Sequence, residues 1–389
     1  MLKKKYFQIL LHVCSFVLSL YRFEHLISTD KKPFRNMDRM KEVFGKRLLN
    51  ARRQAGLSQD QLVALINGRV KKTAIAKYER GEMMPETEVI ETLARALNKS
   101  IDYFFRAFSV SVSSVEFRAK STLGNKKAES LKNIIVSKIE RYLELEKLLN
   151  MNTGFENPLN GITVSTPEDV ENAAVKLASA WNLGSDGMWN VIGTLEDNGI
   201  KVIEIEADED FDGYSAYANE IIPVIVLRNT GNTTERKRLT ALHETSHLLL
   251  RFDENLTDAE KERFCHRFAG AILMPAATLY RELGRFRSLI TKRELGLLKD
   301  KYGISAKAIV VRAYQLNIIS KYLYIKLLSE ISADKYEKHI GSNNKYERSI
   351  RFEMLLSRAL SEGLISHGKA AELAGMTIEE LMNNIITNG

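Results

Sequence analysis

The sequence predicts a multidomain protein that is mainly α-helical and contains one small α+β part. Its 389 residues exceed the ~100–200 residues of an ordinary single domain. Apolar residues recur every three or four positions in the first and last thirds of the chain, which is typical of helices. Between them, residues 200–227 form a β-rich stretch with three runs typical of strands. Helices, then a small sheet, then helices favour separate α and α+β units over a doubly wound sheet.

The composition is that of a globular protein, with 44% hydrophobic and 27% charged residues. The net charge of +8 is concentrated, because residues 39–80 contain eleven Lys or Arg and three Asp or Glu, a surplus equal to that of the whole chain. This segment is therefore suited to a polyanionic partner. Two cysteines, Cys14 and Cys265, argue against a disulfide framework and favour a reducing cytoplasm.

Residues 1–36 form an apolar N-terminal extension. Three lysines precede an apolar run over residues 6–20, as in a secretory signal. The run is shorter than the ~20 residues that a membrane span requires. There are three alternatives. The segment is an upstream extension of a protein that truly starts at Met37 or Met40, a membrane-proximal anchor, or a real secretory signal. We favour the first, expect no stable membrane association, and begin the fold at Met37.

Residues 37–108 are predicted to form five short helices, with breaks at glycines, Asn67 and Pro85. Ser58 is a suitable N-cap residue for a helix, and Gln61 stands where a capping box places its third residue. After a turn, residues 71–79 form a second short helix in which Ile75 faces inward. Two such helices form a helix-turn-helix, whose second helix enters the major groove of double-stranded DNA.

Exposed residues of this second helix are predicted to meet base edges, and basic or polar residues around it to contact phosphates. The base-reading candidates are Lys72, Thr73 and Lys77. The phosphate-contacting candidates are Gln59, Arg52, Arg53, Arg69 and Lys71. A homodimer is expected, since such proteins usually read two-fold operators.

Residues 44–105 resemble the lambda-repressor-like (XRE) helix-turn-helix family. The matching positions are Gln59, Leu62, Ile75, Glu79, Gly81 and Pro85. The turn at residues 67–70 is about two residues longer than is usual in that family, and Lys71 stands where a Ser or Thr cap is common. The resemblance implies a five-helix domain that binds operator DNA.

Residues 109–160 are predicted to be an extended connector followed by a long helix at about 128–149. Residues 161–325 hold helices at 167–181 and 188–198, then strands at 200–205, 214–218 and 224–227, and then a helix capped by Asn232 or Thr233. Trp181 and Trp189 are expected in the core of this domain. Residues 326–389 form a helical C-terminal domain, either a second small helix-turn-helix or a packing or dimerisation unit.

A metal site is predicted in the middle domain. His243 and His247 lie four residues apart, so both imidazoles project from one face of a helix and can bind one Zn²⁺. Glu244 lies beside them to polarise a zinc-bound water, whose pKa the metal lowers toward ~7. The leucines around the two histidines indicate a buried helix, in which unpartnered imidazoles are unfavourable.

A third ligand is expected from the next helix, which Thr257 opens with a capping box. Glu262 and His266 share one face of that helix. We favour Glu262 as the ligand and His266 as the hydrogen-bonding partner of a ligand, with His266 itself as the less favoured ligand. A surface pair of the two is the remaining alternative, and Cys265 projects from a different face.

Residues 235–250 and 262–275, within a longer region from about 164 to 311, resemble the ImmA/IrrE metallopeptidase family. The resemblance implies a zincin-like domain with a zinc site of His243, His247 and Glu262, with Glu244 as general base. His266 stands where the family usually has Asn or Asp. Members of this family relieve repression by cleaving or displacing a lambda-like repressor.

These observations together predict a cytoplasmic, DNA-binding transcriptional regulator that carries a zinc-dependent endopeptidase. Its protein substrate is expected to be of the repressor or antitoxin type. The alternative is a repressor or antitoxin whose metal domain is catalytically silent and senses a ligand or a partner protein.

Overall fold

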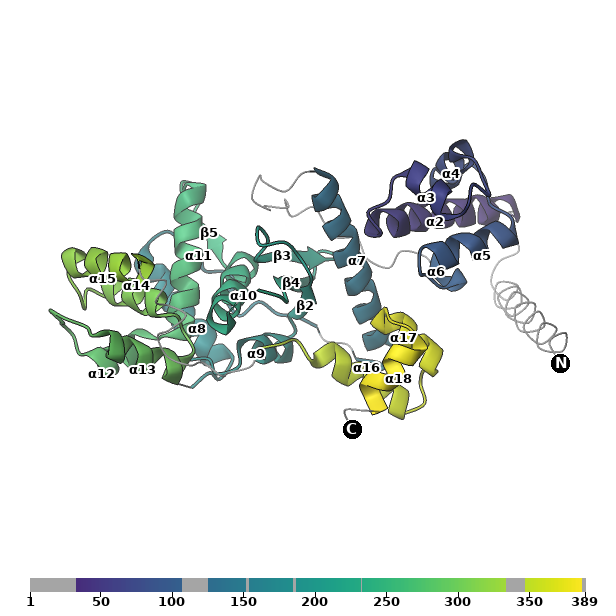
Figure 1. The fold of residues 1–389 in the computed structure, drawn as a ribbon. Helices are drawn as coiled ribbons and strands as arrows, with labels where there is room; N and C mark the ends of the chain where they lie inside the picture. Colours follow the sequence, from purple (N-terminus) through teal and green to yellow (C-terminus); the bar gives the residue numbers. More distant parts are fainter. Residues whose placement is uncertain are drawn as a thin grey trace. The chain divides into compact units, whose positions relative to one another are not determined.

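The computed structural model describes residues 33–106, 125–151, 154–184, 187–231, 233–333 and 347–386 (Figure 1). The chain divides into two compact units near residue 106, except that residues 50–58 cluster with the second unit. The structure confirms a mainly helical fold with small sheets in the middle of the chain. Among the described residues, no helix combines the length and the apolar character needed to cross a membrane.

The first unit consists of five helices, as the sequence predicted. They are α2 (Pro33–Gln54), α3 (Gln59–Leu65), α4 (Lys72–Glu79), α5 (Thr87–Ala96) and α6 (Ile101–Phe105). Phe44, Leu62 and Phe104 are fully buried in its core. The turn between α3 and α4 contains Asn67 and Gly68 at φ 54° and 67°. Asn and Gly adopt this left-handed conformation more readily than other residues, which explains the break at this point.

The second unit is built around a three-stranded sheet with the order β2–β4–β3. The strands are β2 (Lys201–Ile205), β3 (Gly213–Ala218) and β4 (Ile222–Arg228). The central strand β4 runs parallel to β2 and antiparallel to β3. The edge strand β3 is therefore bonded on one side only within the described sheet.

Helices cover both faces of this sheet (Figure 1). On one face Ile135 and Ile139 of α7 (Asn125–Leu148) pack in one core with Ile203 and Val226. On the other face the sheet packs against a second core that contains α10 (Thr234–Leu249). Neighbouring strand residues point to opposite faces, so each strand contributes to both cores.

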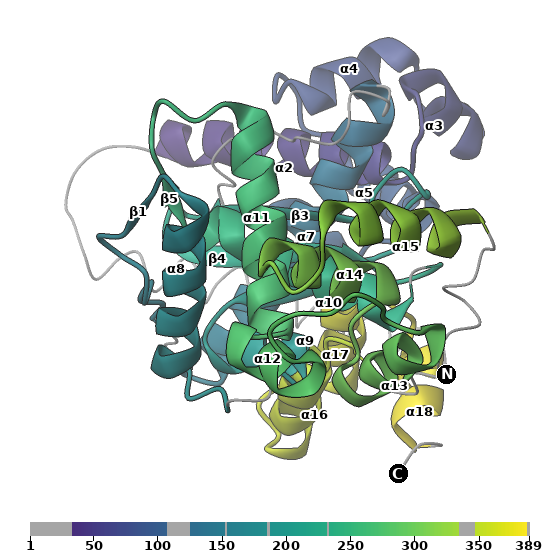
Figure 2. The same ribbon diagram turned by 90° about the vertical axis from the view of Figure 1, so that its left-hand side faces the viewer.

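The other elements of this unit that precede the C-terminal helices are drawn in Figure 2. They are β1 (Thr163–Val164), α8 (Pro167–Ala180), α9 (Val191–Asp197), β5 (Arg251–Phe252), α11 (Asp258–Leu273), α12 (Ala276–Leu283), α13 (Lys292–Tyr302), α14 (Ala306–Gln315) and α15 (Lys321–Ala333). The short strands β1 and β5 pair in parallel. Thr233, one of the two predicted cap residues, caps α10, and Thr257 opens α11 with the predicted capping box.

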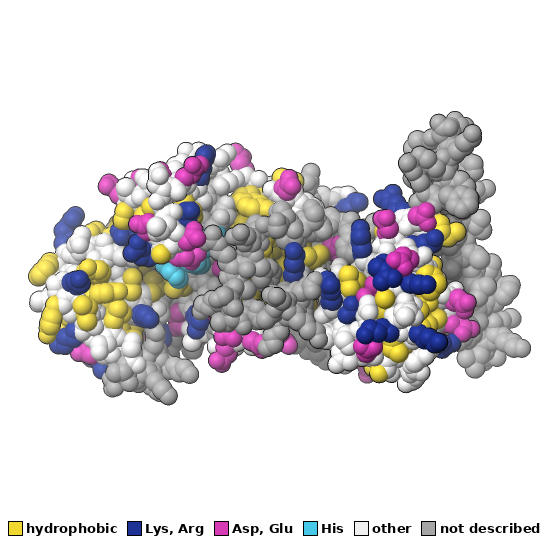
Figure 3. All heavy atoms as spheres, turned by 90° about the horizontal axis from the view of Figure 1, so that it is seen from above, with side chains coloured by type: hydrophobic (Ala, Val, Ile, Leu, Met, Phe, Trp, Pro, Cys, Tyr) yellow, Lys and Arg dark blue, Asp and Glu magenta, His cyan; other side chains and the backbone are white. Residues whose placement is uncertain are grey.

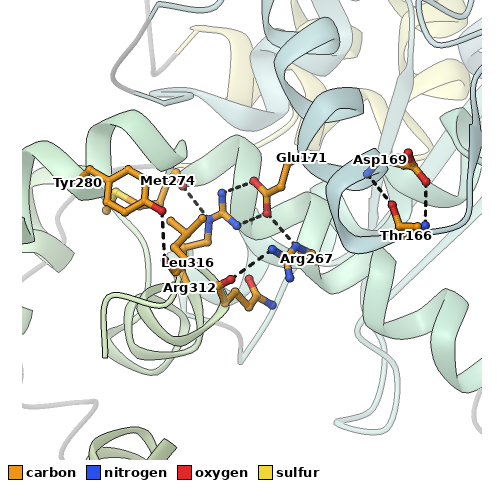
Figure 4. Close-up of polar contacts among 9 residues, drawn as sticks. Thr166, Asp169, Glu171, Arg267, Met274, Tyr280, Arg312 and Leu316 are labelled. Atoms are coloured by element: carbon orange, nitrogen blue, oxygen red, sulfur yellow. Dashed lines mark hydrogen bonds and ion pairs between the residues drawn. The ribbon is translucent and has the colours of Figure 1, made fainter. Parts of the chain in front are cut away.

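An ion-pair network ties α8 to α11 and α14 (Figure 4). The guanidinium of Arg312 contacts both carboxylate oxygens of Glu171, at 2.5 and 2.6 Å, and also donates to the backbone oxygen of Met274. Arg267 donates to the same carboxylate at 2.8 Å. These contacts lower the pKa of Glu171 against the opposing effect of burial. A bidentate pair of this kind fixes the distance and the angle between helices.

The C-terminal helices pack against the second half of α7. They are α16 (Arg351–Ser361), α17 (His367–Ala374) and α18 (Ile378–Ile386). Tyr142 and Leu145 of α7 share a core with Leu356 and Leu373. The long helix therefore contacts both the sheet and the C-terminal helices.

The segment that leads into α16 docks onto the middle of the second unit. The Glu347 carboxylate accepts hydrogen bonds from the backbone N–H groups of Val191 and Ile192, both 3.0 Å, at the start of α9. It also lies 3.5 Å from the guanidinium of Arg238, a fully buried residue of α10. Ser349 donates to the Glu196 carboxylate at 2.6 Å.

Most expected elements of the middle domain are present with ends shifted by a few residues. The expectation that both tryptophans fill the core is wrong for Trp189, which is 57% exposed, whereas Trp181 is partly buried against the core. Trp189 directly precedes the N-cap of α9. The apolar run at residues 6–20 and the connector at 109–118 lie outside the described residues.

Candidate metal centre and nucleic-acid interface

The metal-site candidates lie on α10 and α11, two neighbouring helices (Figures 1 and 2). On α10 the side chains of Leu242, Thr245 and Leu249 are buried in the core. This leaves the partly exposed His243 and His247 on the face that meets Glu262 of α11. The four-residue spacing thus has the effect expected for a helix.

The donor atoms of these three residues converge. The Nε2 atoms of His243 and His247 are 3.2 Å apart, and the Glu262 oxygens lie 3.2 Å from the first and 3.5 Å from the second. A tetrahedral zinc ion with bonds of ~2.0–2.1 Å separates its ligand atoms by roughly 3.4 Å. The donor set therefore fits one such ion. Among the described residues, these three form the one group of potential metal ligands whose donor atoms all lie close enough together to hold an ion.

The electrostatics of the cluster favour an ionised carboxylate. A hydrogen bond from His243 is the largest cause that lowers the pKa of Glu262 to about 2, and His247 lowers it further. Glu262 thus stays negative throughout the neutral pH range. Its side chain is 40% exposed, and histidine side chains reach the surface beside acidic ones in Figure 3. The site is therefore open to solvent on one side, as a catalytic metal site requires.

Glu244 is held by the edge strand of the sheet. Ser215 on β3 donates its hydroxyl to Glu244 Oε2 at 2.6 Å. Burial raises the pKa of Glu244, while the Ser215 hydrogen bond and the charge of His243 oppose that rise. The strand comes this close because residue 213 is glycine, where a Cβ would lie 2.6 Å from Thr240 Cγ2 and 3.2 Å from Glu244 Cγ.

Ser215 is a residue that sequence reasoning missed. The strand was predicted, and its alternation places Ser215 on the face opposite Tyr214. That alternation was the available signal, but it did not show which face meets α10.

Two further residues border the histidines. The His266 ring lies 4.3 Å from the His243 ring between centroids, at an angle of 39°. The buried Cys265 places its sulfur 3.7 Å from His247 Nδ1, the ring nitrogen that does not face Glu262. His243 Nδ1 is buried and has no hydrogen-bond partner among the described residues. The second nitrogen of a zinc-bound histidine usually donates to a partner, so this position departs from the common pattern.

In the first unit, α4 presents the expected exposed surface. Lys72, Thr73 and Lys77 are exposed, whereas Ile75 and Tyr78 are buried. Lys71 is the N-cap residue of α4 and makes no side-chain cap. Basic side chains are numerous on the face of this unit that Figure 3 shows.

Polar contacts hold the two helices of the motif together. Gln59 of α3 donates to the Glu79 carboxylate of α4 at 2.8 Å. Lys72 forms an ion pair with Asp60 at 2.6 Å. Arg52 donates to the backbone oxygen of Leu57 at 2.8 Å. Gln59 therefore joins α3 to α4 in this structure, in addition to any contact with DNA.

The two folds and the donor cluster define a helix-turn-helix protein with a metallopeptidase-like domain. Residues 195–314 match the family described as IrrE N-terminal-like domain (Peptidase_M78), and residues 48–104 match the family described as Helix-turn-helix (HTH_3). The chain thus contains an XRE-type helix-turn-helix domain and an IrrE N-terminal-like domain. The first implies DNA binding, and the second, together with the His-His-Glu cluster, indicates a metal ion.

Wider comparisons add little. No curated protein matches the chain. One similar solved structure is the apo form of the competence regulator ComR from Streptococcus vestibularis. It is 14% identical, and the match covers 76% of this chain and 99% of that chain, with a TM-score of 0.16. A TM-score this low supports no inference about function.

Proposed function

We propose that this protein is a DNA-binding transcriptional regulator whose IrrE-like domain is a zinc-dependent endopeptidase. Its substrate would be of the repressor or antitoxin type, either another protein or this chain itself. The observation that supports this most is the convergence of His243, His247 and Glu262, with Glu244 positioned beside them. His266 would support this cluster by packing against His243.

The chemistry follows from the positions of these groups. Zinc held by the three ligands would supply Lewis-acid activation of water and of a peptide carbonyl. The Ser215 hydrogen bond occupies Glu244 Oε2, which leaves Oε1 to accept the proton of the attacking water. Glu244 would then deliver that proton to the leaving amine nitrogen. Burial raises the pKa of Glu244 toward the working pH, which suits a group that both accepts and donates a proton.

Metal content and cleavage test this proposal separately. Purified wild-type protein should contain about one zinc per chain, and His243→Ala should lose it. Glu244→Gln should retain the zinc, since Glu244 is not a ligand in this proposal, and should abolish zinc-dependent cleavage of a co-incubated repressor-type protein or of the chain itself. Wild-type protein without bound metal would contradict the proposal.

A catalytically silent metal domain that senses a ligand or a partner is the second candidate. It is favoured by His243 Nδ1, which has no hydrogen-bond partner within the described residues, whereas zinc ligands in active sites are usually oriented by one. The Glu244→Gln variant distinguishes the two, because a silent domain would keep both its metal and its regulatory response.

For the DNA-binding domain we propose that Lys72, Thr73 and Lys77 read base edges from α4. The support is their exposure on the helix whose opposite face is buried through Ile75. The proposed phosphate contacts are Gln59, Arg52, Arg53, Arg69 and Lys71. The protein is proposed to act as a homodimer in the cytoplasm, and footprinting of a genomic fragment by wild type and Thr73→Ala tests the base-reading assignment.

A further inference from the structure

A cavity of about 480 Å³ lies in the second unit, apart from the donor cluster. Its walls come from α7, β2, the start of α10, the segment at residues 347–349, and α16 with the end of α17. The volume is within the ~300–1,000 Å³ usual for small-molecule sites. The cavity is bounded by both the IrrE-like domain and the C-terminal helices, so a single ligand there would contact both.

The charged side chains of the lining favour an anion. The acidic residues already have basic partners: Glu204 lies 2.5 Å from Lys237, and Glu353 lies 2.8 Å from Arg348. Glu347, the third acidic lining residue, faces Arg238 and caps α9. The carboxylates that border the cavity are therefore neutralised within the protein.

Lys138 is different. Its ammonium donates to the backbone oxygen of Glu204 at 2.8 Å, and no carboxylate among the described residues is within ion-pair distance of it. Arg141, one helical turn later, borders the same cavity. Burial and the charge of Arg141 lower the pKa of Lys138, while the charges of Glu204 and Glu206 oppose that effect. An anion beside the Lys138 ammonium would favour its charged form.

Other residues of the lining are apolar or aromatic. The rings of Tyr142 and Phe352 lie 5.7 Å apart between centroids, and both border the cavity. Leu356, Leu373 and Met376 complete this wall. A ligand that matches Lys138 and this apolar lining has an anionic group and an apolar body.

We propose that this cavity binds a small organic anion, a carboxylate, phosphate or sulfonate attached to an apolar ring or chain. The anionic group pairs with Lys138, and the apolar body lies against Tyr142 and Phe352. This is a ligand site separate from the metal centre, and it stands whether or not the metal domain is a peptidase.

Two fluorescent probes of matched shape test the site on the full-length protein. The first is 1-anilinonaphthalene-8-sulfonate, and the second is its uncharged analogue N-phenyl-1-naphthylamine. The variants are Lys138→Met, which removes the charge but keeps the length, and Ala374→Phe, which fills the cavity. Lys132→Met is the matched control, because Lys132 is exposed on the same helix and does not border the cavity. Circular dichroism checks that each variant is folded.

We expect the sulfonate to bind at one site per chain and to bind Lys138→Met about tenfold more weakly, the loss that corresponds to one favourable charge interaction. The uncharged probe should bind Lys138→Met as it binds wild type, and Lys132→Met should change neither affinity. Ala374→Phe should lose both probes. Equal sulfonate affinity of Lys138→Met and Lys132→Met overturns the proposal, as does the absence of saturable binding up to about 1 mM. If Ala374→Phe does not fold, the two lysine variants decide.

Discussion

Removal of Glu171 should destabilise the second unit strongly, because it strands a buried cation. The Arg312 side chain is 1% exposed and has both carboxylate oxygens of Glu171 as partners. Loss of one member of a buried pair costs about 3–5 kcal/mol. For a domain of this size each kcal/mol corresponds to roughly 2–4 °C, so Glu171→Ala should lower the midpoint of thermal unfolding by about 6–20 °C. Circular dichroism melts measure this directly.

Glu168→Ala is the control for that experiment, because Glu168 is an exposed carboxylate on the first turn of the same helix. Its loss should cost less than about 1 kcal/mol. Glu171→Leu combined with Arg312→Met removes both charges of the buried pair. Arg267 also loses its carboxylate, but it is 17% exposed and can be hydrated, so at least half of the lost stability should return. Equal melting points for Glu171→Ala and Glu168→Ala would refute the reasoning.

Three further predictions concern protonation and DNA. Burial raises the pKa of Glu196 to about 7. Its protonated form therefore contributes fully to the free energy of unfolding below pH 4.5, and this contribution is lost as the pH rises through 7. Glu196→Gln should abolish this loss, of up to about 3 kcal/mol, in urea unfolding at pH 5 and pH 8; an unchanged difference contradicts the prediction. Ser215→Ala removes a hydrogen bond that lowers the pKa of Glu244, so the acidic limb of any cleavage should move to higher pH with the metal content unchanged. Lys71→Ala should reduce the slope of log affinity against log salt by about 0.9 on a labelled duplex, whereas Lys176→Ala should not.

The parts of the site that depend on local sequence were predictable. The helical spacing of His243 and His247, the Thr257 capping box and the inward position of Ile75 follow from residues within one or two helical turns. The same holds for the five helices of the DNA-binding domain, whose breaks coincide with glycines and Asn67.

The parts that depend on distant segments were not predictable. The alternation of β3 places Ser215 opposite Tyr214, but only the packing of α10 decides which of them meets Glu244. The amphipathic pattern of α7 predicted a helix without showing that its apolar face covers the sheet. Trp189 was predicted to lie in the core but is exposed. The residues next to it in the sequence do not determine the direction in which its indole ring points.

Glu347 caps α9 and thereby limits where this protein can be truncated without loss of stability. Residues 195–314 carry the family match and include Glu235, one of the two acids whose charges favour the charged form of Arg238. The other acid, Glu347, also accepts from the first amides of α9 and lies well beyond the match. An excised peptidase-like fragment would keep a guanidinium sealed in its interior without that counter-charge. The autonomous folding unit is thus longer than the homologous segment, and its boundary follows the carboxylate at position 347.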